Sequence, residues 1–219
     1  MTESQSTKAQ RRIKSALAEL LSEKTLQSLS VSDIARRARV NRGTFYLYYT
    51  DKFDLMRQLA DATMADISAI ITKPASTPSS PGGEVIPRDT IVRLLEYMRS
   101  DIAFVQALIG PNGIPSLAEQ LKAIVIANLR QRLADAPAAA VAAVDTRPEP
   151  AGASTVRDMP QDYLDELLMS SVVSVILLWI RRGAAEPPEQ VADLIDAARR
   201  LSPLDLLALS IPSAAPADA

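Results

Sequence analysis

The segment Ser-Val-Ser-Asp-Ile-Ala-Arg-Arg-Ala-Arg-Val-Asn-Arg-Gly-Thr-Phe-Tyr-Leu-Tyr-Tyr-Thr-Asp-Lys, residues 30–52, predicts two short helices joined by a tight turn. Ser30 followed by Asp33 has the spacing of an N-terminal capping box for the first helix, and Asn41 is a good N-cap for the second, over 42–48. That second helix carries polar, basic and aromatic side chains instead of a full apolar face. Such a pair is typical of a helix-turn-helix, whose second helix enters the major groove of DNA.

Several side chains of the second helix suit contacts with DNA. Arg42 can donate two hydrogen bonds to a guanine or hold a phosphate, and Asn41 can pair with an adenine or cap the helix. Gly43 has no side chain, so the backbone can approach DNA closely there. The hydroxyls of Thr44 and Tyr46 can reach phosphates or base edges.

The neighbouring residues divide between packing and phosphate contacts. Phe45 and Tyr49 are four residues apart, so we expect them to share one helix face and to pack against the first helix. Tyr48 lies near the helix end, where a phenol can reach a phosphate, and Lys52 lies in the first turn of the next helix. Three further arginines fit phosphate contacts and a solvated basic face equally well: Arg36, Arg37 and Arg39.

Composition excludes several classes of protein. The 219 residues include no Cys and no His, which excludes disulfides, zinc-finger ligand sets and acid–base chemistry by histidine. No nucleophile–base pair, phosphate-binding loop or metal-ligand set is recognisable, so we expect neither an enzyme nor a cofactor or metal site. The longest apolar run, 172–180, is too short to span a bilayer, and residues 1–10 lack a secretory signal. We therefore expect a cytoplasmic protein without a membrane partner.

Charge is distributed unevenly along the chain. Residues 1–57 contain 11 Lys and Arg against 6 Asp and Glu, whereas residues 58–219 contain 13 against 20. The net charge of −2 therefore combines a basic N-terminal part with an acidic remainder. This asymmetry is what one expects when only one end of a protein meets a polyanion.

Hydrophobic periodicity predicts an all-α fold, because no segment alternates as a strand does. Proline- and glycine-rich stretches separate the expected helices, notably a connector over 74–87 and a loop over 136–160. Thr50 is the expected N-cap of the fourth helix. The expected helices cover residues 9–24, 31–38, 42–48, 51–71, 90–109, 116–134, 161–182 and 188–201.

Residues 8–57 resemble the DNA-binding domain of the TetR family of transcriptional regulators. The motifs that carry the resemblance are Ser-Val-Ser-Asp-Ile-Ala, Val-Asn-Arg-Gly-Thr-Phe-Tyr-Leu-Tyr-Tyr and Asp-Lys-Phe-Asp-Leu. Arg39 departs from the family, because it occupies a turn where a glycine with positive φ is usual. The resemblance implies these DNA-facing residues: Ser32, Asn41, Arg42, Gly43, Thr44, Tyr46, Leu47, Tyr48 and Lys52.

The second half resembles a C-terminal domain of one TetR subgroup, similar to the regulators of dihydroxyacetone kinase operons. The matching segments are 104–108, 110–113, 115–116, 179–183 and 188–189. The expected organisation is an N-terminal three-helix helix-turn-helix domain and a helical domain for effector binding and dimerisation, followed by a flexible tail. The boundaries are 1–57, 58–205 and 206–219.

A homodimer is expected, because one helix-turn-helix makes too few base contacts for useful specificity. Two copies about one helical turn (~34 Å) apart would read a near-palindromic operator in double-stranded DNA. The last two helices carry apolar stripes that could form a four-helix bundle between two copies or belong to the core of one. The expected interface residues are Leu164, Leu167, Leu168, Ser171, Val172, Val175, Leu178, Val191, Leu194, Ile195 and Ala198.

The resemblance also implies a small-molecule effector that changes the separation of the two DNA-binding domains, with the long helix from Asp51 as the lever. No charged residue marks the effector's chemistry, so its identity stays open. The leading hypothesis is a dimeric repressor that an effector releases from DNA; the alternative is a coactivator with the same fold that works through a partner protein. Residues that could line the pocket, or form plain core, are Tyr97, Met98, Phe104, Leu108, Ile124, Met169 and Trp179.

Overall fold

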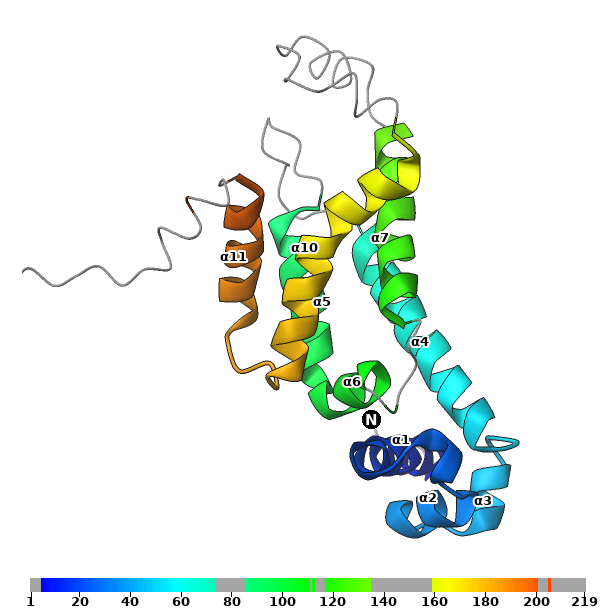
Figure 1. Ribbon diagram of the computed structural model, residues 1–219. Helices are drawn as coiled ribbons and strands as arrows, with labels where there is room; N and C mark the ends of the chain where they lie inside the picture. Colours follow the sequence, from blue (N-terminus) through cyan, green and yellow to red (C-terminus); the bar gives the residue numbers. More distant parts are fainter. Residues whose placement is uncertain are drawn as a thin grey trace, which may run out of the picture.

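The computed structural model describes residues 5–73, 86–110, 112, 117–134, 159–200 and 205. Every regular element in these ranges is helical, in agreement with the predicted all-α class (Figure 1). The expected connector at 74–87, the loop at 136–160 and the tail at 206–219 fall mostly or wholly outside them. The elements are α1 (Gln5–Glu23), η1 (Leu26–Ser28), α2 (Val31–Ala38), α3 (Arg42–Tyr46), α4 (Lys52–Thr72), α5 (Arg88–Ser100), α6 (Ile102–Ile109), α7 (Leu117–Ala134), α10 (Gln161–Arg181) and α11 (Pro188–Arg200).

The N-terminal helices α1, α2 and α3, with the start of α4, form a small unit that we call the head. Its core is apolar and closely packed: Ile13, Leu17, Ile34, Phe45 and Leu55 are fully buried. The three- and four-residue spacing of the apolar side chains in α1 turns one face of that helix onto this core. The packing fixes α2 and α3 relative to each other.

Capping residues define the helix starts in the head. The Ser30 hydroxyl accepts the Asp33 N–H at 3.1 Å while the Asp33 carboxylate accepts the Ser30 N–H at 3.1 Å, so the predicted capping box is present. Asn41 Oδ1 accepts the Gly43 N–H at 2.9 Å, which confirms the second cap. The predicted cap at Thr50 is wrong, because the carboxylate of Asp51 accepts the Phe53 and Asp54 N–H groups, each at 2.8 Å.

The helices α4, α5, α7, α10 and α11 form the body. In Figure 1, α4 runs from the head up into the body, and α5, α7, α10 and α11 lie alongside one another there. Their shared core includes Ile67, Leu95, Met169, Trp179 and Ile195. Ion pairs join the helices at the surface, between Arg88 and Asp193, Lys122 and Glu166, and Arg130 and Asp165.

One predicted helix is broken in the structure. The sequence predicts a continuous helix over 90–109, but α5 ends at Ser100 and α6 begins at Ile102. Asp101 between them has φ −142° and ψ 51°, and its carboxylate lies 2.6 Å from Lys14 Nζ on α1. A tertiary contact with the head thus accompanies the break, and no glycine or proline marks it in the sequence.

The short helix α6 connects the body to the head. Phe104, Ala107 and Leu108 of α6 belong to the same buried cluster as the core of α1. The Lys14 ammonium lies 4.2 Å from the centre of the Phe104 ring, and Asn112 Nδ2 donates to the carbonyl of Leu21 at 3.0 Å. Head and body therefore meet along α6 as well as through α4, which passes continuously across the expected domain boundary at residue 57.

Helix α10 bends by 45° between its parts Gln161–Leu167 and Val172–Arg181. The Ser170 hydroxyl donates to the carbonyl of Glu166 at 2.6 Å inside this bend, a back-bonding contact that favours helix bending. These two parts satisfy length and apolarity criteria for a bilayer span only when taken together, and no single described helix does so.

Candidate functional site

The helix α3 and the turn after it present polar and aromatic side chains to solvent. We call α3 the reader helix. Tyr46 is 49% exposed and Leu47 is 76% exposed, whereas Phe45 on the opposite face is fully buried and Tyr49 nearly so. The predicted division between packing and outward-facing residues is therefore confirmed for Phe45 and Tyr49. The helix is shorter than predicted, because regular α-helical structure ends at Tyr46 instead of Tyr48.

Arg42 and Tyr46 contact each other on the exposed face. Arg42 Nη2 donates to the Tyr46 hydroxyl at 3.3 Å, and the guanidinium carbon lies 5.9 Å from the centre of the Tyr46 ring. One turn of helix separates the two residues, which is the spacing at which side chains meet. A planar donor fork and a phenol are thus held side by side on one surface of the reader helix.

Asn41 and Gly43 shape the start of the reader helix. Because the Asn41 side-chain oxygen caps the helix, the geometry selects capping over adenine pairing for that oxygen. A Cβ added at Gly43 would meet only Asn41 Oδ1, at the ordinary contact distance of 3.6 Å. Packing within the protein therefore does not require a glycine there.

The remaining expected DNA-facing residues differ in exposure. Ser32 lies exposed in the first turn of α2, while Thr44 and Tyr48 are half-buried. Lys52 is half-buried as well, and its ammonium donates to the main-chain carbonyls of Gln27 and Leu29, each at 2.6 Å. In this conformation the lysine is thus bonded within the head.

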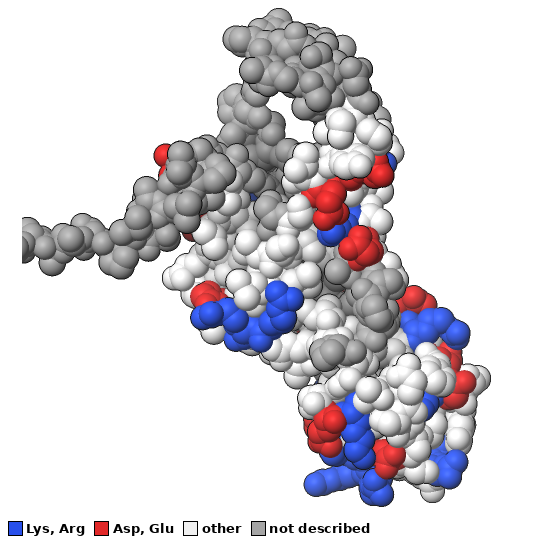
Figure 2. Space-filling view, in the orientation of Figure 1, with Lys and Arg blue, Asp and Glu red and all other residues white. Residues whose placement is uncertain are grey.

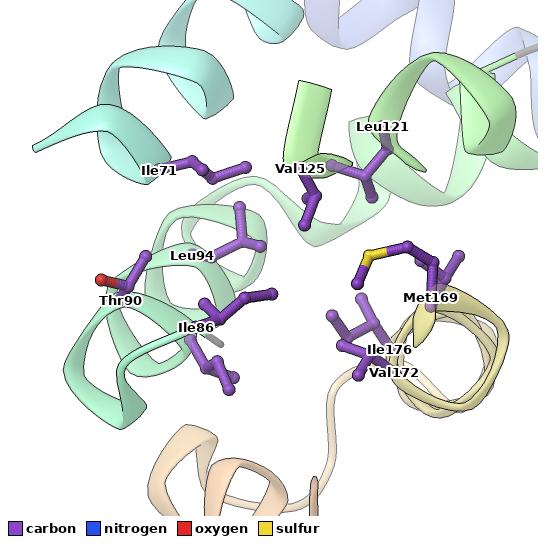
Figure 3. Close-up of a pocket in the computed structure, with 11 residues that line it drawn as sticks. Ile71, Ile86, Thr90, Leu94, Leu121, Val125, Met169, Val172 and Ile176 are labelled. Atoms are coloured by element: carbon purple, nitrogen blue, oxygen red, sulfur yellow. The ribbon is translucent and has the colours of Figure 1, made fainter. Parts of the chain in front are cut away.

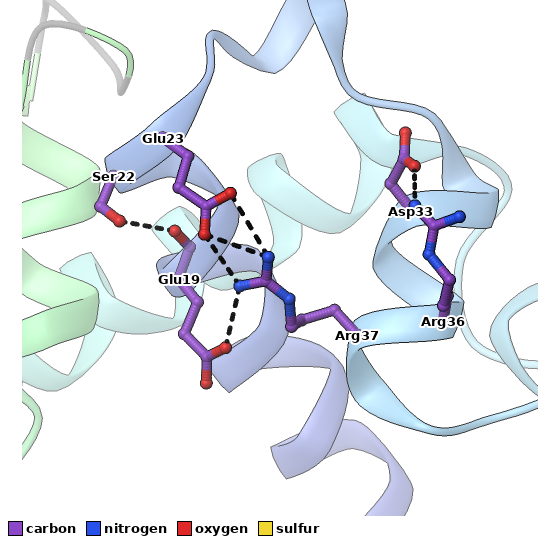
Figure 4. Close-up of polar contacts among 6 residues, drawn as sticks. All are labelled: Glu19, Ser22, Glu23, Asp33, Arg36 and Arg37. Carbon is purple, nitrogen blue, oxygen red and sulfur yellow. Dashed lines mark hydrogen bonds and ion pairs between the residues drawn. The ribbon is translucent and has the colours of Figure 1, made fainter.

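Two of the head's arginines form ion pairs inside the head (Figure 4). Arg37 contacts both Glu19 and Glu23 of α1, at 3.1 and 3.0 Å, and these hydrogen bonds raise the pKa of its guanidinium. Arg36 pairs with Asp33 at 2.6 Å; the hydrogen bonds from Ser30 and this arginine lower the pKa of the Asp33 carboxyl. The sequence left a phosphate contact and a solvated face open for Arg37, but in the structure its guanidinium instead joins α2 to two glutamates of α1.

The surface of the head is of mixed charge as a result. Figure 2 shows acidic side chains interspersed among the basic ones over the head, at the lower end of the view. Arg57 is also paired, with Asp54 at 2.5 Å. These pairs leave the excess of basic over acidic residues in 1–57 unchanged, but they engage the guanidinium groups of Arg36, Arg37 and Arg57 within the head.

The turn between α2 and α3 has the backbone conformation expected from the sequence. Arg39 has φ 54° and ψ 45°, in the left-handed region that glycine adopts most readily. Its N–H bonds the carbonyls of Ala35 and Arg36, which closes the end of α2. The turn therefore keeps a positive φ although an arginine occupies it.

The body contains a small cavity enclosed by apolar side chains. Its volume is about 20 Å³, and Figure 3 shows side chains from α4, α5, α7 and α10 pointing into it. Among the described lining residues only Thr90 is polar, and its hydroxyl accepts a hydrogen bond from Arg93 Nη2 at 3.0 Å. The lining residues are Ile71, Ile86, Thr90, Ile91, Leu94, Leu121, Val125, Met169, Val172, Val173 and Ile176.

The pocket residues expected from sequence do not come together. Met169 alone of the seven lines this cavity. Met98 and Leu108 line a second cavity of about 20 Å³, nearer the head. Tyr97 and Phe104 line an open groove of about 460 Å³ between α1, α4, α5 and α6, whereas Ile124 and Trp179 line none of these spaces. The seven residues therefore do not line the one shared pocket expected from sequence, because α6 carries Phe104 and Leu108 into the head's core.

Tyr97 has a specific partner in that groove. Its hydroxyl donates to Asp66 Oδ2 on α4 at 2.8 Å. Burial and the neighbouring Asp66 carboxylate together raise the pKa of Tyr97 to about 12. The tyrosine therefore stays neutral and ties α5 to α4.

The last two helices expose part of the apolar stripe expected from sequence. Leu167 is 75% exposed, Leu178 51% and Leu194 52%, while Leu164, Val175 and Ala198 are half-buried. Val172, Val191 and Ile195 are instead buried in the core of the body, so they are removed from the expected interface. The side chains of Leu168 and Ser171 lie outside the described part of the structure.

Two sequence families match the chain. Residues 13–59 match "Bacterial regulatory proteins, tetR family", and residues 87–198 match "Transcriptional regulator C-terminal region". A curated relative, the uncharacterised HTH-type transcriptional regulator YxbF of Bacillus subtilis, is 38% identical over 53 residues. That alignment covers 24% of this chain and spans only 14% of the relative's length.

Solved structures share the fold at low sequence identity. A TetR transcriptional regulator from Streptococcus agalactiae superposes with a TM-score of 0.52 at 18% identity, over 87% of this chain and 93% of the other. A regulator from Aquifex aeolicus gives 0.54 at 14% identity, over 88% and 98%. The dihydroxyacetone kinase operon activator DhaS is a weaker match that does not by itself show a shared fold: its TM-score is 0.46 at 18% identity, over 93% of this chain and 96% of the other.

Proposed function

We propose that this chain, which belongs to the TetR family of bacterial regulatory proteins and is a transcriptional regulator, works as a homodimeric repressor. In this proposal, two copies bind a near-palindromic operator through their reader helices, and a small-molecule effector in the body releases them. The observation that carries the proposal is the exposed face of α3, where Arg42, Tyr46 and Leu47 project to solvent from a helix anchored by buried Phe45.

In this proposal, some side chains of the reader helix and the turn after it contact bases and others contact phosphates. The Arg42 fork suits the O6 and N7 acceptors of guanine in the major groove, and Leu47 suits the methyl group of thymine. The hydroxyls of Thr44, Tyr46 and Tyr48 suit phosphates at the edge of the groove. Ser32 on α2 and the backbone at Gly43 complete the contact surface.

Dimerisation would use the exposed stripe of the last two helices. Leu167 and Leu178 lie on α10 and Leu194 on α11, all more than half exposed in the single chain. Large apolar side chains in such a stripe favour a four-helix bundle formed by two helices from each copy. The bundle would hold the two heads at a fixed separation, which a palindromic site requires.

The effector would enter the apolar cavity of the body. At about 20 Å³ the cavity is far smaller than the roughly 300–1,000 Å³ of typical ligand pockets, so binding must move its walls. Its lining supports an apolar effector, since Thr90, the polar residue among those described there, already has a partner in Arg93. Ile71, in the last turn of α4, forms part of the wall, so expansion there would displace the helix that enters the head.

The contact of α6 with α1 gives the body a second path to the head. The Lys14–Asp101 ion pair and the buried Phe104 ring resist any movement of the head relative to α6. A ligand that moves α4 while α6 holds α1 would tilt the head. A difference in ligand affinity of a few kcal/mol between the two head positions is enough to change DNA occupancy substantially.

Selection of DNA by the purified chain tests this function. The protein alone is incubated with a pool of random duplexes, and the bound fraction is amplified and sequenced over several rounds. The proposal expects a near-palindromic consensus of roughly 15–20 base pairs, as two half-sites one turn apart require. Failure to enrich any sequence at low salt would instead support the alternative, a coactivator that needs a partner protein.

A further inference from the structure

Lys52 occupies an unusual position for a residue expected to face DNA. It opens α4, yet its ammonium points back into the head, where it donates to the carbonyls of Gln27 and Leu29 at 2.6 Å each. The same nitrogen lies 5.0 Å from the centre of the Phe53 ring. Two short charge-assisted hydrogen bonds to main-chain carbonyls indicate a structural engagement of this side chain.

The two carbonyls belong to the connection that leads into α2. Gln27 lies in the turn η1, and Leu29 is the residue that ends this turn and directly precedes the N-cap Ser30. The Leu29 side chain is only 2% exposed, so this connection is anchored in the core. Lys52 therefore contacts the chain immediately before the helix-turn-helix begins.

Lys52 itself lies immediately after the helix-turn-helix ends. The reader helix ends at Tyr46, a short turn follows, and α4 begins at Lys52. One side chain thus joins the two ends of the 29–52 segment, which contains both α2 and α3. A closed segment of this kind has fewer arrangements of its two helices available to it than an open one.

We propose that Lys52 positions the reader helix by acting as a clasp between the start of α4 and the entry to α2. A lysine ammonium has three N–H donors, and the two carbonyls take two of them. The third is left for a DNA phosphate, which adds to the clasp without replacing it. This role rests on the proposed DNA-binding function for its effect, but the clasp itself is a property of the free protein.

The first test needs no DNA. Lys52→Met keeps the aliphatic stem and removes the donors, and Lys8→Met is the matched control, because Lys8 is an exposed lysine on α1 in the same head. The measurement is amide hydrogen exchange, resolved over residues 29–34 and 52–56. The clasp predicts roughly tenfold faster exchange in both segments for Lys52→Met alone. Unchanged exchange in Lys52→Met would overturn the proposal, whatever the protein does with DNA.

The second test separates positioning from a simple phosphate contact. Both variants are titrated against the selected operator and a scrambled duplex of equal length, at a temperature where both are fully folded. Loss of the clasp lowers operator affinity roughly tenfold more than affinity for scrambled DNA, because base contacts depend on helix orientation. Loss of a phosphate contact alone lowers both affinities equally and reduces the salt slope by about 1, and that result contradicts the positioning role. If wild-type protein binds no DNA, the proposed function fails, while the exchange measurement still decides the clasp.

Discussion

Arg42 and Tyr46 already contact each other before any DNA is present. The 3.3 Å hydrogen bond and the cation–π geometry hold the guanidinium near the phenol, so less side-chain freedom is lost when they bind. In the proposed complex, these two exposed side chains on one helical turn would contact a base and a phosphate together.

Removing either side chain should weaken operator binding. We expect Arg42→Ala and Tyr46→Ala each to cost ~1–3 kcal/mol of binding free energy if the contact is to a base. Because the two residues touch, the double variant should lose less than the sum. Fluorescence anisotropy at fixed salt measures all three, with exposed Arg99→Ala on the body as control. Unchanged affinity in both single variants would remove α3 from the interface.

The left-handed turn at Arg39 should carry a measurable strain. A residue with a Cβ at φ 54° is disfavoured relative to glycine. We therefore expect Arg39→Gly to be more stable than Arg39→Ala by about 1 kcal/mol in urea unfolding, since both variants lose the charge but only one relieves the strain. Ala62→Gly, at an exposed position inside α4, should show the opposite sign by a similar amount. Equal stability of the two Arg39 variants would contradict the strain.

Among the elements, α4 depends on a carboxylate network at its start. Asp54 Oδ2 accepts the Thr50 N–H at 2.9 Å and the Gln58 amide at 3.0 Å, and Arg57 lies beside it. The Thr50 main-chain hydrogen bond, the Gln58 amide and the Arg57 charge all lower the pKa of the Asp54 carboxyl below its ordinary value. The network holds the turn after the reader helix.

This lowered pKa gives the head a pH dependence with a definite sign. A carboxyl with a depressed folded-state pKa contributes its full stability above the unfolded pKa of about 3.9 and loses it as the pH falls further. The free energy of unfolding should therefore fall below about pH 4, and Asp54→Asn should flatten that fall. Urea titrations from about pH 6 to pH 2.5 measure the free energy of unfolding at each pH. The variant Asp61→Asn, at an exposed carboxyl, is the control. If Asp54→Asn and the wild type lose stability identically with falling pH, the Asp54 carboxyl is not a source of this pH dependence.

The helix α6 should make the head and body unfold together. Phe104 is 2% exposed and lies in the head's core although it belongs to α6, so Phe104→Ala should lower the free energy of unfolding by ~3–5 kcal/mol. Phe53→Ala, at a ring 51% exposed, should change it by less than about 0.5 kcal/mol. Calorimetry would show one transition in the wild type, and two separate transitions there would contradict the coupling.

Local signals explain which elements could be predicted from sequence. Ser30, Asp33 and Asn41 act on their own neighbours, so the start of α2 and that of α3 follow from residue type and spacing. The break at Asp101 could not be predicted, because it involves a contact with Lys14, 87 positions earlier in the chain. The prediction of which residues line the pocket was wrong for the same reason. The sequence shows that Phe104 is large and apolar, but it does not show that α6 turns this side chain toward the head.

Hydrophobic periodicity also could not predict which apolar residues of α11 are buried and which are exposed. Val191, Leu194 and Ile195 all fit an apolar stripe, yet Val191 and Ile195 are buried and Leu194 is 52% exposed. Only the position of α11 against α5 and α10, which includes the Arg88–Asp193 pair, decides which residues face the protomer's own core. The candidate DNA-facing set depended on side-chain chemistry and, for Ser32 and Leu47, on the family resemblance, and it stays a prediction.

At the scale of the whole molecule, the exposed leucines of the last two helices should control assembly. A charge at Leu178 or Leu194 would be buried without a partner in the proposed bundle, so Leu178→Arg and Leu194→Arg should give folded monomers with greatly weakened operator binding. Leu47→Arg, at an exposed leucine in the head, should leave the oligomeric state unchanged. Sedimentation velocity reports the assembly state of each, and dimers in both body variants would place the interface elsewhere.

Hydroxyl-radical footprinting on the selected DNA shows whether two copies read one operator symmetrically through α3. We expect two equivalent protected regions related by a two-fold axis, with their major-groove centres about one turn (~34 Å) apart, and loss of both in Arg42→Ala. A single asymmetric protected region, or a footprint that Arg42→Ala leaves intact, would show that two copies do not bind the operator in this way.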